Sequence, residues 1–383
     1  MKKKKRKQVS FLFAMLILVA ALAGCSKQGE KDQSPVSTPV PPTKKAETPE
    51  PAGDKNVSAE FRDTDGEGNS FEIAAYKDIE TPENEKNIKK IRIGALTGIY
   101  FGATLKLAYQ LGLFEQEFGP DGIEIELTYF SSGPPAREAM AAGEIDFSTL
   151  GDLPALSGYA GGVDYRVIST DSVSDTIGGI LVKADSDIKS LNDLNGKTVA
   201  VGIGTTQQKI FLQMIASVGL SENEVSEANI SGSTALASIE TGDVDGWFTY
   251  EPNIYQNVDS GALRLLEKMN GYPSVMYVLG MQSFISEHPN ITARFLQVLQ
   301  RATEYLAAHP EESYTLLQQT TETDYGDLSR YFNEFEWGHH LTSDDVEVLR
   351  TTNQFVVDHE IAPAVDLKAF VDDSYLKRAF EYR

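Results

Sequence analysis

The sequence is poor in cysteine and histidine, and both shortages limit what the protein can do. Cys25 is the single cysteine among 383 residues, so no intramolecular disulfide can form and the fold must depend on its core. The five histidines show no HExxH or similar spacing, and adjacent residues such as His339 and His340 rarely converge on one metal ion. We therefore expect neither a metal nor a cofactor.

Several catalytic motifs and a basic charge excess are also missing. The chain has no Gly-x-Ser-x-Gly, no P-loop and no GxGxxG followed by a fitting acidic residue, so nothing indicates an enzyme. The formal net charge is −22, and it becomes −28 once the six cations of the leader are removed. Strong acidity disfavours nucleic acid or anionic lipid as a partner. An anionic ligand would have to be attracted by local dipoles.

The amino terminus is typical of a signal peptide. Six basic residues, Lys2 to Lys7, precede an apolar run from Phe11 to Ala23 that is too short for a stable membrane span. The run ends in Leu22-Ala23-Gly24-Cys25, which resembles the lipobox of bacterial lipoproteins. This resemblance implies cleavage after a leader at 1–24 and acylation of Cys25. A free cysteine beside an ordinary signal peptide is the alternative.

The next segments differ in composition. Residues 25–56 are rich in Lys, Glu, Pro, Ser and Thr with almost no apolar residue, so we expect a disordered tether. Residues 57–89 form a small N-terminal extension, in which Asp65-Gly66 and Gly68-Asn69 allow a hairpin. The body that begins near Ile91 has about 290 residues, enough for two lobes.

One stretch organises the body. Ile123 to Leu127 alternates apolar and acidic residues, which predicts a half-buried strand, and Pro135 suits the first turn of a helix that Gly143 ends. A strand then starts at 145–147. The loops at 131–133 and 151–153 thus each follow a strand and precede a helix, which is where α/β sheets bind ligands.

The body also repeats itself. Ala142-Gly143-Glu144-Ile145-Asp146 returns as Thr241-Gly242-Asp243-Val244-Asp245, and strands near 91–94 and 198–201 each lead through a glycine loop into a helix. Each copy then runs into an acidic residue near a proline, Asp152 before Pro154 and Glu251 before Pro252. Two copies of strand–loop–helix–strand indicate two α/β lobes facing each other.

The remaining pattern predicts how the lobes are connected. Extended runs at 176–183 and 274–281 could carry the crossings, and helical spacing follows at 291–308, 311–319 and 344–359. We expect this tail to pack on the first lobe. The expected lobes are 90–178 with 283–383, and 179–282, and a cleft with hinges between them suits a small ligand.

The span from Ile91 to about Phe380 resembles the solute-binding lipoproteins of ABC importers for sulfonates, nitrate and taurine, most of all the aliphatic-sulfonate and taurine branch. The resemblance rests on Ser-Gly-Pro-Pro at 132–135, Ala-Gly-Glu-Ile-Asp-Phe at 142–147, Gly151-Asp152, the run at 188–200 and Glu251-Pro252. It implies a two-lobed periplasmic-binding-protein type II fold, each lobe a mixed sheet flanked by helices with the ligand cleft between the lobes.

Within that cleft we expect residues of several kinds to bind the ligand. Unpaired N–H groups at the helix after Gly204, with the hydroxyls of the threonines there and of the serines of the other lobe, suit an anionic group; each threonine could instead be a simple helix cap. Asp152 and Glu251 could receive a cationic end, with capping as the alternative for Asp152. Tyr100 suits an apolar tail, with ordinary packing as the alternative. The candidate ligand-binding residues are Thr97, Tyr100, Ser131, Ser132, Gly133, Gly151, Asp152, Thr176, Thr205, Thr206, Gln207 and Glu251.

Some positions depart from the sulfonate-binding pattern. Leu153 stands where those relatives carry a polar residue, Gln207 replaces an alanine, and Tyr250 replaces a tryptophan before the acidic–proline pair. We expect Leu153 to be where the ligand preference changed. Trp247 is expected in the core, and Trp337 is a candidate for one wall of the cleft.

The sequence therefore predicts a monomeric, lipid-anchored binding protein on the extracytoplasmic face of a bacterial membrane, or in the periplasm. It would capture a sulfonate-like or taurine-like anion by hinge closure and deliver it to an ABC permease and its ATPase. A binding protein for nitrate or a pyrimidine thiamine precursor, or a sensor that signals to a membrane receptor, is the alternative. The same fold resembles a thiamine-pyrimidine synthase, but the cysteine-rich motif of that family is absent.

The lipobox interpretation predicts the behaviour of one variant. Cys25→Ser removes the sulfur that would be acylated, so the protein should leave the membrane fraction and become soluble. Fractionation of cells followed by immunoblotting measures this, and anchoring that is unchanged by the substitution would contradict the prediction.

Overall fold

The computed structural model describes residues 73–321 and 324–382. The expected leader at 1–24, Cys25, the tether at 25–56 and the hairpin at 65–69 lie outside these residues. No helix in the described ranges is both long and apolar enough to cross a membrane.

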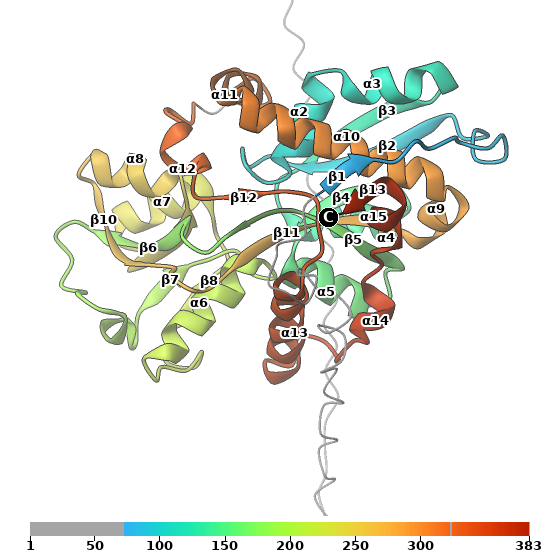
Figure 1. Ribbon diagram of the computed structural model, residues 1–383. Coiled ribbons are helices and arrows are strands. Elements are labelled where there is room, and N and C mark those ends of the chain that lie inside the picture. Colours follow the sequence, from blue (N-terminus) through green and yellow to red (C-terminus); the bar gives the residue numbers. More distant parts are fainter. Residues whose placement is uncertain (1–72, 322–323, 383) are drawn as a thin grey trace, which may run out of the picture. The chain divides into compact units, whose positions relative to one another are not determined.

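The first lobe is built on a six-stranded mixed sheet, in the order β12-β5-β11-β4-β2-β3 (Figure 1). Its strands are β2 (Lys90–Leu96), β3 (Glu124–Phe130), β4 (Phe147–Gly151), β5 (Tyr165–Ser174), β11 (Ser274–Met281) and β12 (Glu336–Trp337). The helices between its early strands are α2 (Ala103–Gln110), α3 (Leu113–Phe118), the 3₁₀ turn η1 (Gly119–Asp121), α4 (Gly133–Ala141) and α5 (Asp152–Ala160).

The second lobe is built on a five-stranded sheet, in the order β10-β6-β9-β7-β8. Its strands are β6 (Gly178–Lys183), β7 (Thr198–Ala200), β8 (Ser226–Ala228), β9 (Gly246–Tyr250) and β10 (Leu263–Lys268). Its helices are the 3₁₀ turn η2 (Leu191–Leu194), α6 (Thr206–Ser217), α7 (Gly232–Thr241) and α8 (Asn253–Asp259). The expected two-lobed α/β fold with mixed sheets is thus confirmed.

The chain crosses between the sheets twice, once after β5 and once after β10. The second crossing, at 269–273, differs from the expected boundary at 282, because β11 pairs with β4 and β5 of the first lobe. Seven of the eight residues of β11 are buried, as a near-continuous apolar run in a central strand requires. The segment 179–282 therefore contains one strand of the first lobe.

The sequence repeat has a structural cause. Gly143 and Gly242 follow α4 and α7 with φ values of 70° and 88°, a left-handed conformation that suits glycine. Three residues later an aspartate side chain accepts a backbone N–H of a strand in the same lobe: Asp146 from Arg92 of β2 at 2.8 Å, and Asp245 from Thr198 of β7 at 3.0 Å. Each motif thus ties a helix end to the neighbouring strand.

The C-terminal tail packs mainly on the first lobe, as expected. Its elements are α9 (Gln282–Glu287), α10 (Pro289–Ala308), α11 (Pro310–Gln318), α12 (Ser329–Phe332), α13 (Ser343–Asp358), α14 (Leu367–Phe370), α15 (Ser374–Ala379) and β13 (Phe380–Tyr382). Helix α10 lies against α2, α3 and α15, and α13 lies against α5 (Figure 1). Strand β1 (Ile73–Tyr76) pairs with β13, so the end of the N-terminal extension joins the same lobe.

The two aspartates of the repeat should differ in their contribution to stability. Asp146 accepts three hydrogen bonds from Arg92 and its side chain is 6% exposed, whereas that of Asp245 is 39% exposed. We expect Asp146→Ala to lower the free energy of unfolding by about 2 to 3 kcal/mol and Asp245→Ala to lower it less, since buried hydrogen bonds to a charge contribute more. Urea unfolding of both variants measures this, and equal losses would contradict it.

Candidate functional site

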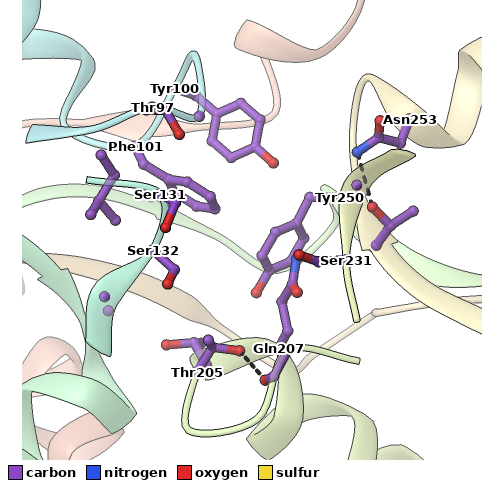
Figure 2. A pocket seen from close by; sticks show the side chains of 18 of the residues that line it. Thr97, Tyr100, Phe101, Ser131, Ser132, Thr205, Gln207, Ser231, Tyr250 and Asn253 are labelled. Carbon is purple, nitrogen blue, oxygen red and sulfur yellow. Dashed lines mark hydrogen bonds between the residues drawn. The ribbon is translucent and has the colours of Figure 1, made fainter. Parts of the chain in front are cut away.

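A pocket of about 330 Å³ is lined by loops and helix starts of both lobes (Figure 2). Ser131 and Ser132 of the first lobe face Thr205 and Gln207 of the second across it. Further lining residues are Leu96, Thr97, Gly98, Ile99, Tyr100, Phe101, Gly133, Gly151, Pro154, Gly202, Ile203, Thr206, Asn229, Ser231, Gly232, Trp247, Thr249, Tyr250, Glu251, Pro252, Asn253, Ser274, Met276 and Tyr325.

Four helices begin at this pocket. Their N-cap residues are Ser132 of α4, Gly151 of α5, Thr205 of α6 and Ser231 of α7, and all four line the cavity. The N-cap side chains make no capping hydrogen bond at these four starts, but in α5 the carboxylate of Asp152 accepts the first-turn N–H of Leu153 at 2.8 Å. The first-turn N–H groups of α4, α6 and α7 have no capping side chain and carry the positive end of the helix dipole, so this part of the pocket wall attracts an anion.

The four helices contribute different donors. In α4, Pro134 and Pro135 have no N–H, so Gly133 and the hydroxyls of Ser131 and Ser132 are its donors near the pocket. The hydroxyls of the two threonines at α6 are already engaged: Thr205 donates to the carbonyl of Gly202 at 2.6 Å, and Thr206 donates to Asp152 at 2.5 Å. Helix α6 can therefore offer its first-turn N–H groups and the Gln207 amide rather than these hydroxyls.

Aromatic rings form another part of the wall. The ring of Tyr100 lies 4.5 Å from that of Phe101 and 6.4 Å from that of Tyr250, so the first and second lobes both contribute (Figure 2). Tyr331 and Phe335 pack against Tyr100 and hold it in place. Burial raises the pKa of Tyr100 and of Tyr250, so both phenols stay neutral at physiological pH. This part of the pocket can hold an uncharged group.

Glu251 is the one charged residue among the lining residues, which include no lysine or arginine. Its Oε2 accepts the N–H of Tyr255 at 3.0 Å, so it caps the start of α8. Desolvation raises its pKa, and the hydrogen bond from Tyr255 opposes that shift. An anion in this pocket is therefore stabilised by dipoles and hydrogen bonds rather than by a neighbouring cation.

A buried lysine supports the first loop from behind. The Lys106 ammonium is fully buried and donates to the carbonyls of Leu96, Gly98 and Ile99 at 3.3, 2.5 and 3.0 Å. Desolvation lowers the pKa of Lys106 to about 7, and the nearby Asp171 opposes this shift. The same burial raises the pKa of the Asp171 carboxyl to about 6, because it disfavours the charged form of either group. Lys106 thus holds the loop that carries Thr97 and Tyr100.

Ten of the twelve candidate ligand-binding residues line the pocket, and two do not. Asp152 lies behind the wall, fully buried, where Lys209, Thr206 and Thr352 contact its carboxylate. It is therefore not available to a cationic end of the ligand; the alternative, capping of the following helix, holds, because its Oδ1 accepts the N–H of Leu153 at 2.8 Å. Thr176 lies outside the lining, on the crossing between the sheets, where its N–H donates to the Ser174 hydroxyl at 3.3 Å.

Three further expectations need correction. Leu153 is fully buried in the core and does not line the pocket, so it cannot contact the ligand. Trp247 is buried as expected but also lines the pocket. Trp337 stacks on Phe332 and packs against Phe335 instead of forming a wall.

Sequence reasoning missed the start of α7. Ser231 follows Ser132 by 99 residues, as Gly242 follows Gly143 and Glu251 follows Asp152, so the repeat contained the signal. Asn229, Gly232, Thr249 and Asn253 also line the cavity, and the Asn253 amide donates to the Thr249 hydroxyl at 3.0 Å (Figure 2). These side chains come from loops whose positions depend on the packing of the whole second lobe.

Comparison with known proteins identifies relatives with this fold. Residues 103–313 match the family described as NMT1/THI5 like. A putative aliphatic sulfonates-binding protein of Bacillus subtilis (strain 168) is 30% identical over 304 residues, covering 78% of this chain and 90% of that protein. The taurine-binding periplasmic protein of Escherichia coli (strain K12) is 22% identical, covering 67% and 85%.

A solved structure agrees with these relatives. The alkanesulfonate-binding protein from Xanthomonas axonopodis pv. citri bound to MOPS superposes with a TM-score of 0.66 at 24% identity, covering 74% of this chain and 98% of that one. At this identity the likeness concerns the fold. The two sequence relatives above are named as binding proteins.

The lowered pKa of Lys106 predicts how stability depends on pH. The unfolded chain holds a proton on this lysine between pH 7 and 10.5 that the folded protein gives up, so stability rises with pH in that window. We expect the free energy of unfolding to increase by about 2 kcal/mol between pH 7.5 and 9.5 through this group. The increase should disappear in Lys106→Met, and an equal increase in the variant and the parent, measured by urea unfolding, would contradict the assignment.

Proposed function

The chain belongs to the NMT1/THI5-like family, and we propose that it is the extracytoplasmic solute-binding component of an ABC importer for a small organic anion of the sulfonate type. The observation that carries this proposal is the meeting of the starts of α4, α6 and α7, which come from two lobes and lack a capping side chain, at one pocket whose lining has no lysine or arginine. Such a wall favours a compact anionic group.

A sulfonate suits these donors. Its three oxygens stay unprotonated at physiological pH and spread one charge over several acceptors. The donors that can reach them come from opposite sides: Gly133 with Ser131 and Ser132 of the first lobe, and the starts of α6 and α7 in the second. An anion bridging the two lobes would stabilise their closed arrangement.

The rest of the ligand faces the aromatic part of the wall. Tyr100, Phe101 and Tyr250 are neutral, and Met276 adds an apolar surface, so an apolar tail would be buried favourably there. A taurine-like ligand would instead place its ammonium near Glu251, whose carboxylate is already used by Tyr255. We therefore propose an alkyl or aryl sulfonate ahead of taurine.

The mechanism we propose is hinge closure. The two crossings, at 175–177 after β5 and at 269–273 after β10, are short connections between separately packed sheets, as hinges require. The closed protein would then dock on the permease, whose ATPase drives release and transport. In this role the protein binds its solute as a monomer without chemical conversion and without a cofactor.

The location follows from the leader. We propose that Cys25 is acylated and that the tether from 25 to 56 holds the binding domain at the extracytoplasmic face of the membrane. The periplasmic taurine-binding relative supports an extracytoplasmic location. Signalling to a membrane receptor is one alternative role. Binding of nitrate or a pyrimidine is the alternative that the ligand panel below addresses.

Ligand class can be tested by calorimetry and thermal shift with 1-hexanesulfonate, benzenesulfonate, taurine, nitrate, a thiamine-precursor pyrimidine and hexylamine. We expect the two apolar sulfonates to bind most tightly and to raise the melting temperature most, with taurine weaker. Stabilisation by nitrate, pyrimidine or amine alone would overturn the sulfonate assignment.

Matched serine variants test the same site. Ser132→Ala and Ser231→Ala each remove a hydroxyl at a pocket-lining helix start, and each should weaken 1-hexanesulfonate binding about tenfold, the effect of one hydrogen bond to a charged group. Ser233→Ala is the control, since this serine is on α7 but outside the pocket lining. Equal affinity in all three variants would contradict the proposed position of the anion.

A further inference from the structure

A buried ion pair crosses from one lobe to the other directly behind the pocket. Lys209, in the first turn of α6 in the second lobe, donates to Asp152, the first residue of α5 in the first lobe. The side chains are 2% and 0% exposed. Two threonines complete the contact, as Thr206 donates to Asp152 at 2.5 Å and Thr352 of α13 donates to it at 2.7 Å.

This cluster is connected to the ligand site through the backbone. Gly151 and Thr206 both line the pocket. Gly151 directly precedes Asp152 in the chain, and Thr206 donates to the Asp152 carboxylate. A Cβ on Gly151 would lie 2.3 Å from the Thr206 hydroxyl oxygen, so only glycine lets the two lobes approach this closely. The starts of α5 and α6 are therefore brought together by protein contacts alone.

Two other ion pairs between the lobes are more exposed. Arg330 and Asp259 pair at 2.6 Å with exposed fractions of 45% and 58%. Lys268 and Glu334 pair at 3.0 Å and are 33% and 27% exposed. Exposed pairs contribute little because water screens them, whereas a buried charge without its partner is strongly unfavourable. Opening of the lobes would separate Lys209 from Asp152. This is unfavourable unless water enters and solvates both charges.

We propose that Asp152 and Lys209 form an inter-lobe latch that holds the protein largely closed before ligand binds. They are positioning residues: they do not touch the ligand, but they set the start of α6 against the start of α5. The inference depends on the proposed function only in taking hinge closure as the working motion. Because the apparent dissociation constant varies inversely with the closed fraction, a tenfold loss of closed protein would weaken ligand binding tenfold.

The test measures the distance between the lobes without any ligand. Spin labels on Glu138→Cys of α4 and Glu240→Cys of α7, both exposed, report the separation in the full chain carrying Cys25→Ser. The latch is removed by Asp152→Asn combined with Lys209→Met, which leaves no uncompensated charge. Asp259→Asn, which breaks the exposed inter-lobe pair, is the matched control.

We expect one dominant short distance in the parent and in the control, and a shift toward longer distances in the double variant. Thr352→Val removes the hydroxyl that contacts both Asp152 and Lys209 but keeps the ion pair, so it should shift the distribution less and in the same direction, and it serves if the double variant does not fold. Identical distributions in the parent and both latch variants, or equal shifts in latch and control variants, would overturn the proposal. Since no ligand is added, a wrong assignment of the ligand would not affect this result.

Discussion

The site depends on one constraint: an anionic ligand would have to be bound in a pocket whose lining contains no cationic side chain. The chain is strongly acidic, and its pocket lining contains Glu251 but no lysine or arginine. Helix dipoles and backbone donors are then the available source of positive potential, and their orientation is fixed by the fold. Such donors are supplied here by the starts of α4, α6 and α7, whose N-cap residues are serine or threonine.

The same constraint explains the two buried lysines. Lys106 in α2 and Lys209 in α6 each lie one turn into the first helix of a lobe, behind the pocket wall instead of in it. One supports the carbonyls of the first loop, and the other binds Asp152 across the lobes. In both places the cation is used to shape the wall, while the ligand is left to the dipoles. Neither lysine is exposed to the cavity, so neither would make the site indiscriminate toward anions.

Much of this architecture could be predicted from local sequence. The strand before Ser131, the helix starting near Pro135 and its end at Gly143 follow from nearest neighbours, and the repeat correctly indicated two similar lobes. The role of Asp152 could not be predicted in this way, because its partners Lys209 and Thr352 lie 57 and 200 residues away. The prediction that Leu153 determines the ligand preference was wrong for a related reason. Its position in the family pattern is next to the site, but in helix α5 its side chain points into the core. Ser231 could have been found, had the repeat been extended back to the start of its helix.

The central claim is that the ligand's anionic group lies at the starts of α4, α6 and α7 and that its tail lies against the aromatic wall. A crystal structure with 2-bromoethanesulfonate tests this most directly, since anomalous scattering locates the sulfur and the bromine separately. The account predicts the sulfur between Ser132 and Ser231, with the bromine toward Tyr100 and Tyr250. A ligand bound in the reverse orientation, or outside this pocket, would contradict it.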